Sequence, residues 1–245
     1  MERINKIKTT AIPENSMTQK LTALYEKNRD KYEDISRIFS DYPLANTYML
    51  TASTEYCEAN VKVMVCGKET NSWGGEFGGH GTASVQDLQQ LFTLYIWEEH
   101  GKGPFHSFIK RLNTIDGVTV LPNNIVKIGK KGKAGHYSAI ARFCNEELPL
   151  LREEIAITTP DLIVCPTSNY DQYNICLSAQ LGNHTEERLG EHIYLRHYES
   201  IPDTPVIICP HPQGKAREDL DVIKDTIENY ICKRFNSSIH SSRLP

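Results

Sequence analysis

Three segments of the chain combine charged, polar and glycine residues beside short apolar runs. They are GKETNSWGGEFGG from Gly67, KKGKAGH from Lys130 and PHPQGKAR from Pro210. Carboxylate, amide and imidazole side chains of this kind can orient or deprotonate a water and can stabilise a leaving anion. The glycines allow backbone N–H groups to approach a ligand closely. We therefore expect these segments to form one site for a small polar ligand.

The first segment contains candidates for handling water and for holding a flat ring. Glu69 and Asn71 come just after a predicted strand, and either side chain could orient or deprotonate a water. Phe77 or Trp73 could stack on a flat ring. The residues alone do not distinguish between the two members of either pair.

Further residues supply an amide that can both donate and accept hydrogen bonds, an imidazole and positive charge. Asn124 offers a paired donor and acceptor, and His211 is held between two prolines, where it could stabilise a leaving anion. Each feature also has a structural explanation, because asparagines occur in turns, lysine runs are commonly solvated, and a histidine beside prolines can be structural. The basic side chains that could bind phosphates are Lys127, Lys130, Lys131, Lys133 and Arg142.

The elements that must position these residues alternate along the chain. Short apolar runs between helical stretches predict an α/β fold with a mostly parallel sheet covered on both faces. In such folds ligands bind beyond the carboxyl ends of the strands, which is where the polar segments fall. The predicted strands lie at 61–66, near 123–129, at 161–165 and at 205–209, and the predicted helices at 17–40, 84–100, 105–115, 145–157 and 217–235.

The overall composition is that of a soluble globular protein. The chain is 39% hydrophobic and 24% charged, and its net charge of −4 means that nucleic-acid affinity must come from a local basic patch. No apolar run approaches the roughly 18 residues of a membrane span, and the N-terminus lacks an apolar signal core, so we expect a cytoplasmic protein without membrane contact. The seven cysteines form no CxxC pair and are expected to be reduced thiols, with no metal site.

In this order, the segments resemble motifs of the uracil-DNA glycosylase superfamily. VKVMVCGKETN at 61–71 resembles the first strand and the motif that holds the water-activating residue. NNIVKIG at 123–129 resembles a strand of the iron–sulfur-type members, and EEIAITTPDLIVC at 153–165 resembles the helix and strand before the closing motif. PHPQGKAR resembles the closing His-Pro-Ser motif, with Gln213 where Ser is usual.

The resemblance implies a monofunctional DNA glycosylase on a three-layer α/β/α sandwich with a mostly parallel central sheet and no cofactor. Such an enzyme flips a nucleotide out of DNA, stacks its base on an aromatic ring and hydrolyses the N-glycosidic bond. By the same resemblance, Glu69 or Asn71 would position water and His211 would stabilise the departing base. The base would be bound by Gly67, Phe77 and Asn124, and DNA by Lys127, Lys130, Lys131, Lys133 and by Lys215 or Arg217 at the position of an inserted wedge.

The chain also departs from the motifs of this superfamily. Thr70 stands where most members have Pro, the closing Ser is replaced, and the stretch at 182–200 is long, polar and rich in His. These departures leave the expected base open between uracil and a bulkier one, such as the glucosylated hydroxymethylcytosine of some phages, which would make the protein a defence enzyme. Two alternatives are a catalytically inactive nucleic-acid-binding module on the same fold and a small-molecule hydrolase on a flavodoxin-like sheet.

The expected organisation is one main domain that acts as a monomer on DNA. A helical extension at 1–50 is expected to pack on a glycosylase-like domain at 51–235, which is followed by a frayed tail at 236–245. His184, His192 and His197 have spacings that fit no standard ligand helix, so we interpret them as surface histidines.

Overall fold

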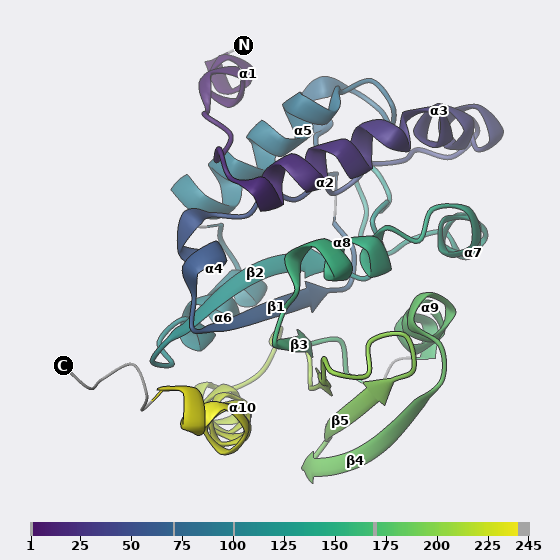
Figure 1. The fold of residues 1–245 in the computed structure, drawn as a ribbon. Coiled ribbons are helices and arrows are strands. Elements are labelled where there is room, and N and C mark those ends of the chain that lie inside the picture. Colours follow the sequence, from purple (N-terminus) through teal and green to yellow (C-terminus); the bar gives the residue numbers. More distant parts are fainter. Residues whose placement is uncertain (1, 71, 100, 169–170, 240–245) are drawn as a thin grey trace.

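A six-stranded sheet in the order β2-β1-β3-β6-β5-β4 forms the centre of the protein (Figure 1). The structure, a computed structural model, describes residues 2–70, 72–99, 101–168 and 171–239. Strands β2, β1, β3 and β6 run parallel, and β5 and β4 add an antiparallel hairpin at one edge. The strands are β1 (Val61–Gly67), β2 (Val118–Asn124), β3 (Leu162–Cys165), β4 (His184–Gly190), β5 (Ile193–Tyr198) and β6 (Val206–Ile208).

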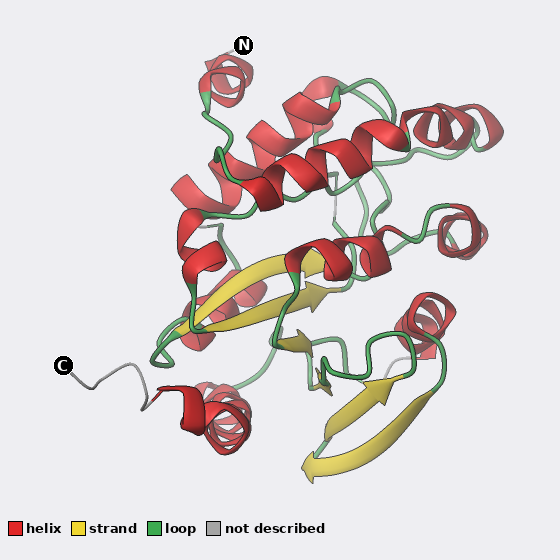
Figure 2. Ribbon diagram, in the orientation of Figure 1, coloured by secondary structure: helices red, strands yellow, loops and turns green. Residues whose placement is uncertain are grey.

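Helices cover both faces of this sheet, because the side chains of its central strands alternate between two apolar layers. Met64 of β1 packs in the cluster that includes α2, α5 and α8, whereas Val63 and Val65 pack with α6 and α10. Figure 2, in the orientation of Figure 1, shows β1 and β2 between the two sets of helices and the hairpin of β5 and β4 to one side of them. The helices are α1 (Glu2–Thr9), α2 (Ser16–Lys27), α3 (Arg29–Ile38), α4 (Thr54–Glu58), α5 (Val85–Phe92), α6 (Pro104–Leu112), α7 (Ser138–Glu147), α8 (Leu150–Thr158), α9 (Asp171–Leu181) and α10 (Arg217–Ile239). The predicted α/β class with a mostly parallel sheet is confirmed.

Several element boundaries differ from the predicted ones. The single helix predicted at 17–40 is two helices that meet at Asn28, and the one predicted at 84–100 changes from α5 to a π-helical turn at Thr93–Glu98. The strand predicted to reach 129 ends at Asn124. The hairpin of β4 and β5 was not predicted, because most side chains of the edge strand β4 are exposed and give no apolar signal.

The segment at 2–50 shares the main hydrophobic core. Ile7 of α1, Leu21 of α2 and Ile35 of α3 are fully buried in the same cluster as Met64 of the central strand β1. This segment therefore packs on the sheet and adds to its core. Within the described residues, no helix is both long and apolar enough to cross a membrane.

A buried ion pair joins three of these elements beneath the end of β2. Lys127 is 5% exposed and Glu154 of α8 is 0% exposed, and the Lys127 ammonium contacts both the Glu154 carboxylate and the side-chain oxygen of Asn123. Asn123 Nδ2 donates to Glu154 Oε2 at 2.9 Å, and the Tyr25 hydroxyl of α2 donates to Glu154 Oε1 at 2.7 Å. Burial lowers the pKa of Lys127, while the Glu154 carboxylate opposes that shift. Each charge is therefore compensated inside the core.

Replacing Glu154 by Gln should destabilise the protein strongly. The variant leaves the buried ammonium of Lys127 without its counter-charge, a change that costs about 3–5 kcal/mol for buried pairs. The free energy of unfolding in urea measures the loss. The control Lys131→Met removes a nearby exposed lysine and should change stability by less than about 0.5 kcal/mol. Equal effects of the two substitutions would contradict a structural role for the pair.

Candidate functional site

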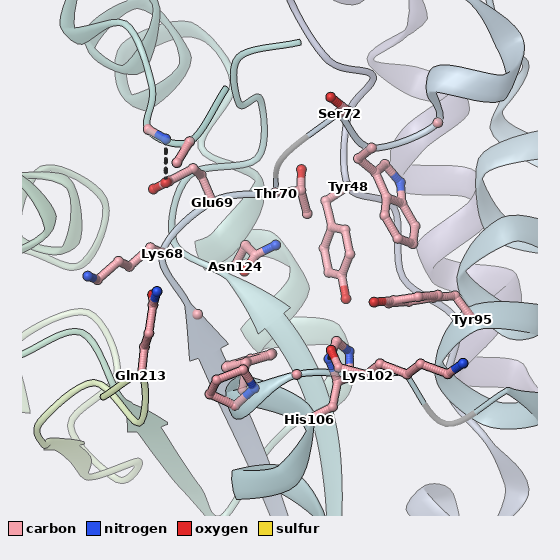
Figure 3. Close-up of a pocket in the computed structure, with 18 of the residues that line it drawn as sticks. Tyr48, Lys68, Glu69, Thr70, Ser72, Tyr95, Lys102, His106, Asn124 and Gln213 are labelled. Atoms are coloured by element: carbon pink, nitrogen blue, oxygen red, sulfur yellow. Dashed lines mark hydrogen bonds between the residues drawn. The ribbon is translucent and has the colours of Figure 1, made fainter. Parts of the chain in front are cut away.

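A cavity of about 800 Å³ opens at the carboxyl ends of β1 and β2 (Figure 3). Gly67 and Glu69 reach it from the end of β1, Asn124 from the last position of β2, and His211 from the loop after β6. The parallel strands thus bring together side chains that lie far apart in the sequence. These four residues were predicted to share one site, and the structure places all of them in the lining of this cavity.

Gly67 and Asn124 meet at close range on the floor of the cavity. They are partners in the β1–β2 register, and a Cβ added to Gly67 would lie 2.7 Å from Asn124 Oδ1 and 3.1 Å from the ring of Phe105. The backbone N–H of Asn124 donates to the side-chain oxygen of Asn123 at 2.7 Å. Within the described part of the chain, the Asn124 amide side chain itself makes no hydrogen bond, so its donor and acceptor can serve a ligand.

Glu69 is held as an ionised carboxylate. The backbone N–H of Gly135 donates to Oε1 at 2.8 Å, the buried Tyr173 hydroxyl of α9 donates to Oε2, and His136 Nδ1 lies 3.8 Å from Oε2. Burial by itself raises the pKa of Glu69, but His136 and the two hydrogen bonds outweigh it and hold the pKa below its ordinary value. The carboxylate therefore keeps its negative charge at neutral pH and has further lone pairs to accept a water.

His211 is oriented as a neutral hydrogen-bond donor. The backbone N–H of Gln213 donates to His211 Nδ1 at 3.2 Å, so the neutral ring carries its proton on Nε2. Burial, together with the nearby Lys68 ammonium, lowers the pKa of His211, although Glu69 opposes the shift. The backbone N–H of His211 donates at 3.0 Å to Ser168 Oγ, and Ser168 has a φ of 56° in the left-handed region. A strained turn after β3 thus supports the imidazole.

Aromatic rings form another wall of the cavity. The centroid of the Trp73 ring lies 4.7 Å from that of Tyr48 and 5.9 Å from that of Tyr95, and both contacts are edge-on. All three rings line the cavity together with Phe105. Tyr95 belongs to the π-helical turn, a feature that often occurs at functional sites. Trp73 was one of two predicted stacking residues. Tyr48, Tyr95 and Phe105 were not predicted. Tyr48 and Tyr95 carry no local signal in the sequence, whereas Phe105 follows directly after a Gly-Lys-Gly-Pro break that could have indicated it.

Two predicted site residues lie elsewhere. Phe77 ends a short turn at Gly75–Phe77 and packs against the main hydrophobic core, outside the cavity lining. Lys127 was predicted to bind DNA phosphates, and this is wrong, because its ammonium is buried against Glu154. Asn71, the other candidate for handling water, lies outside the described residues.

The remaining basic residues lie at the surface around the cavity. Lys131 and Lys133 are exposed on the loop whose Ala134 and Gly135 line the cavity, and the half-buried Lys130 places Nζ 4.7 Å from the centre of the Tyr137 ring. The other two predicted DNA contacts, Lys215 and Arg217, are exposed just beyond His211, and Arg217 lies 4.0 Å from Asp221.

No protein-family model matches the chain, and no curated protein matches it. Among the residues that the structure describes, no group of three or more His, Cys, Asp or Glu side chains could hold a metal ion.

Substituting Gly67 by Ala should disturb the floor of the cavity. The new methyl group would overlap Asn124 Oδ1 and press on Phe105, and overpacking of this kind costs about 1–3 kcal/mol. Urea denaturation measures this loss. Gly79→Ala is the matched control, because no heavy atom lies within 4 Å of its added Cβ. Equal stability of the two variants would contradict the close approach of Gly67 and Asn124.

Removing the Tyr173 hydroxyl should raise the pKa of Glu69. The hydroxyl donates to the ionised carboxylate, so Tyr173→Phe withdraws stabilisation from the charged form, and the proton is then held to a higher pH. A pH titration followed by carboxyl ¹³C NMR measures the shift. Tyr137→Phe, at a tyrosine without a contact to Glu69 among the described residues, should leave this pKa unchanged. An unchanged Glu69 pKa in Tyr173→Phe would contradict the assignment.

Proposed function

We propose that this protein is a DNA glycosylase, which takes a base out of DNA and hydrolyses its N-glycosidic bond. The observation that carries the proposal is the convergence of Glu69, Asn124 and His211 on one cavity from three strand ends of a parallel sheet. This arrangement supports the roles implied by the resemblance to the uracil-DNA glycosylase superfamily. The chemistry requires an anionic group for water, a polar group for the base edge and a donor for the departing base.

The proposed reaction assigns one task to each side chain. The ionised Glu69 carboxylate orients a water and accepts its proton as the water oxygen attacks C1′. The electron pair of the C1′–N bond passes to the base, and the Nε2–H of neutral His211 donates to the resulting anion. The amide of Asn124 pairs with the base edge. Phe105 or Trp73, in the cavity wall, takes the stacking role that the resemblance gave to Phe77.

The size of the cavity supports a bulky base. Its volume of about 800 Å³ is similar to the volumes of pockets that bind drug-sized ligands, about 300–1,000 Å³. We therefore favour a modified base, such as glucosylated hydroxymethylcytosine in phage DNA, over uracil. The exposed Lys131, Lys133, Lys215 and Arg217 flank the cavity and would contact phosphates, which makes binding sensitive to salt.

Base release from defined DNA substrates tests this proposal. Purified protein is incubated with DNA that carries glucosylated hydroxymethylcytosine, uracil or only normal bases, and hot alkali then cleaves any abasic sites. Glu69→Gln should lower the rate by about 10²- to 10⁴-fold, as for loss of a general base, and His211→Ala by about 10²- to 10³-fold. Glu58→Gln, at an exposed glutamate of α4, is the control.

Three other outcomes would each overturn a part of this proposal. Salt-sensitive DNA binding without base release would point to an inactive binding module on the same fold. Absence of both binding and base release would favour a small-molecule hydrolase. Efficient release of uracil with the modified cytosine left intact would keep the reaction but overturn the proposed substrate.

A further inference from the structure

Lys68 lines the cavity, but no bond-making or proton-transfer step of the proposed base release uses it. It lies between Gly67 and Glu69 at the end of β1, and Figure 3 shows its side chain between Glu69 and Gln213. Its Nζ lies 5.8 Å from the centre of the Tyr173 ring, the same tyrosine that donates to Glu69. The amine and the carboxylate thus share one wall of the cavity.

The surroundings of Lys68 favour a reactive amine. Burial lowers the pKa of its ammonium, and the adjacent Glu69 carboxylate only partly opposes this. A larger fraction of uncharged amine is therefore present near neutral pH than at an exposed lysine, and desolvated lysines in pockets are known as nucleophiles toward carbonyl groups. In its charged form, Lys68 also contributes to the lowered pKa of His211.

Beyond the monofunctional chemistry that the resemblance implies, we propose that Lys68 attacks the aldehyde of an abasic site and cleaves the DNA strand on its 3′ side by β-elimination. The substrate of this second activity is the product of the first, so the inference rests on the proposed function. The cavity would then hold the deoxyribose after the base has left, with C1′ open to the amine from the side of β1.

The steps of this lyase reaction balance without a cofactor. The Lys68 nitrogen bonds to C1′ of the ring-opened sugar, and the aldehyde oxygen leaves as water, which gives an imine. The C2′ proton passes to the Glu69 carboxylate, and the electron pair of that C–H bond moves through the sugar to break the C3′–O bond. The 3′ phosphate leaves with the downstream strand, and a water then hydrolyses the imine and restores the amine.

Reductive trapping on preformed abasic DNA tests the proposal directly. Wild-type protein is incubated with an oligonucleotide that already contains an abasic site, and borohydride reduces the imine to a stable amine bond that links protein to DNA. We expect a covalent adduct and strand cleavage without alkali. Both should be lost in Lys68→Arg, which keeps a positive charge but cannot form the imine. Lys102→Gln, at an exposed lysine of the same cavity, should still give the adduct.

The outcomes separate this inference from the proposed function. An equal adduct in wild type and Lys68→Arg, or no adduct in wild type, overturns the lyase role of Lys68. Base release without an adduct would leave the glycosylase standing alone. An adduct lost in Lys68→Arg, but without base release from any substrate, would support the lyase and remove the glycosylase. DNA binding by Lys68→Arg is measured by gel shift. Retained binding would show that the loss of the adduct does not result from misfolding.

Discussion

The buried ion pair of Lys127 and Glu154 determines how the chain leaves β2, and the site depends on that exit. Because two desolvated charges are tolerated only when they compensate each other, the segment after β2 must turn inward at Lys127. Asn123 belongs to the same network, and its side-chain oxygen accepts hydrogen bonds from the Lys127 ammonium and from the backbone N–H of Asn124. The direction in which Asn124 faces the cavity is therefore a consequence of charge compensation in the core.

Backbone hydrogen bonds connect the loops after β1 and β2. The position of the segment after β2 therefore also affects the position of Glu69. The N–H groups of Ile125 and Val126 donate to the carbonyls of Gly67 and Lys68, each at 2.9 Å, so the pairing continues past the end of the sheet. A Cβ at Gly129 would lie 1.9 Å from the Thr70 carbonyl oxygen. Glycine at this position thus permits the loops to touch.

Two residues that line the cavity are held in opposite states of charge. Hydrogen bonds keep Glu69 charged despite its burial, whereas burial and a nearby cation keep His211 neutral. A fixed anion beside the sugar and a fixed donor beside the base would match the separation of charge as an N-glycosidic bond breaks. The same anion beside Lys68 gives the proposed lyase step a proton acceptor.

The class of fold, and the edge of the sheet at which the candidate site lies, could be predicted from the sequence. The apolar runs of β1 and β6 and the polar residues that follow them, Glu69 and His211, are local signals that can be recognised in the linear sequence. Only the tertiary structure showed that Lys127 is buried whereas Lys131 is exposed, because Glu154, the partner of Lys127, lies on the distant helix α8. The tertiary structure likewise showed which aromatic rings reach the cavity, since Tyr48 and Phe105 line it from separate segments. Contacts between distant segments leave no pattern in the sequence of either one.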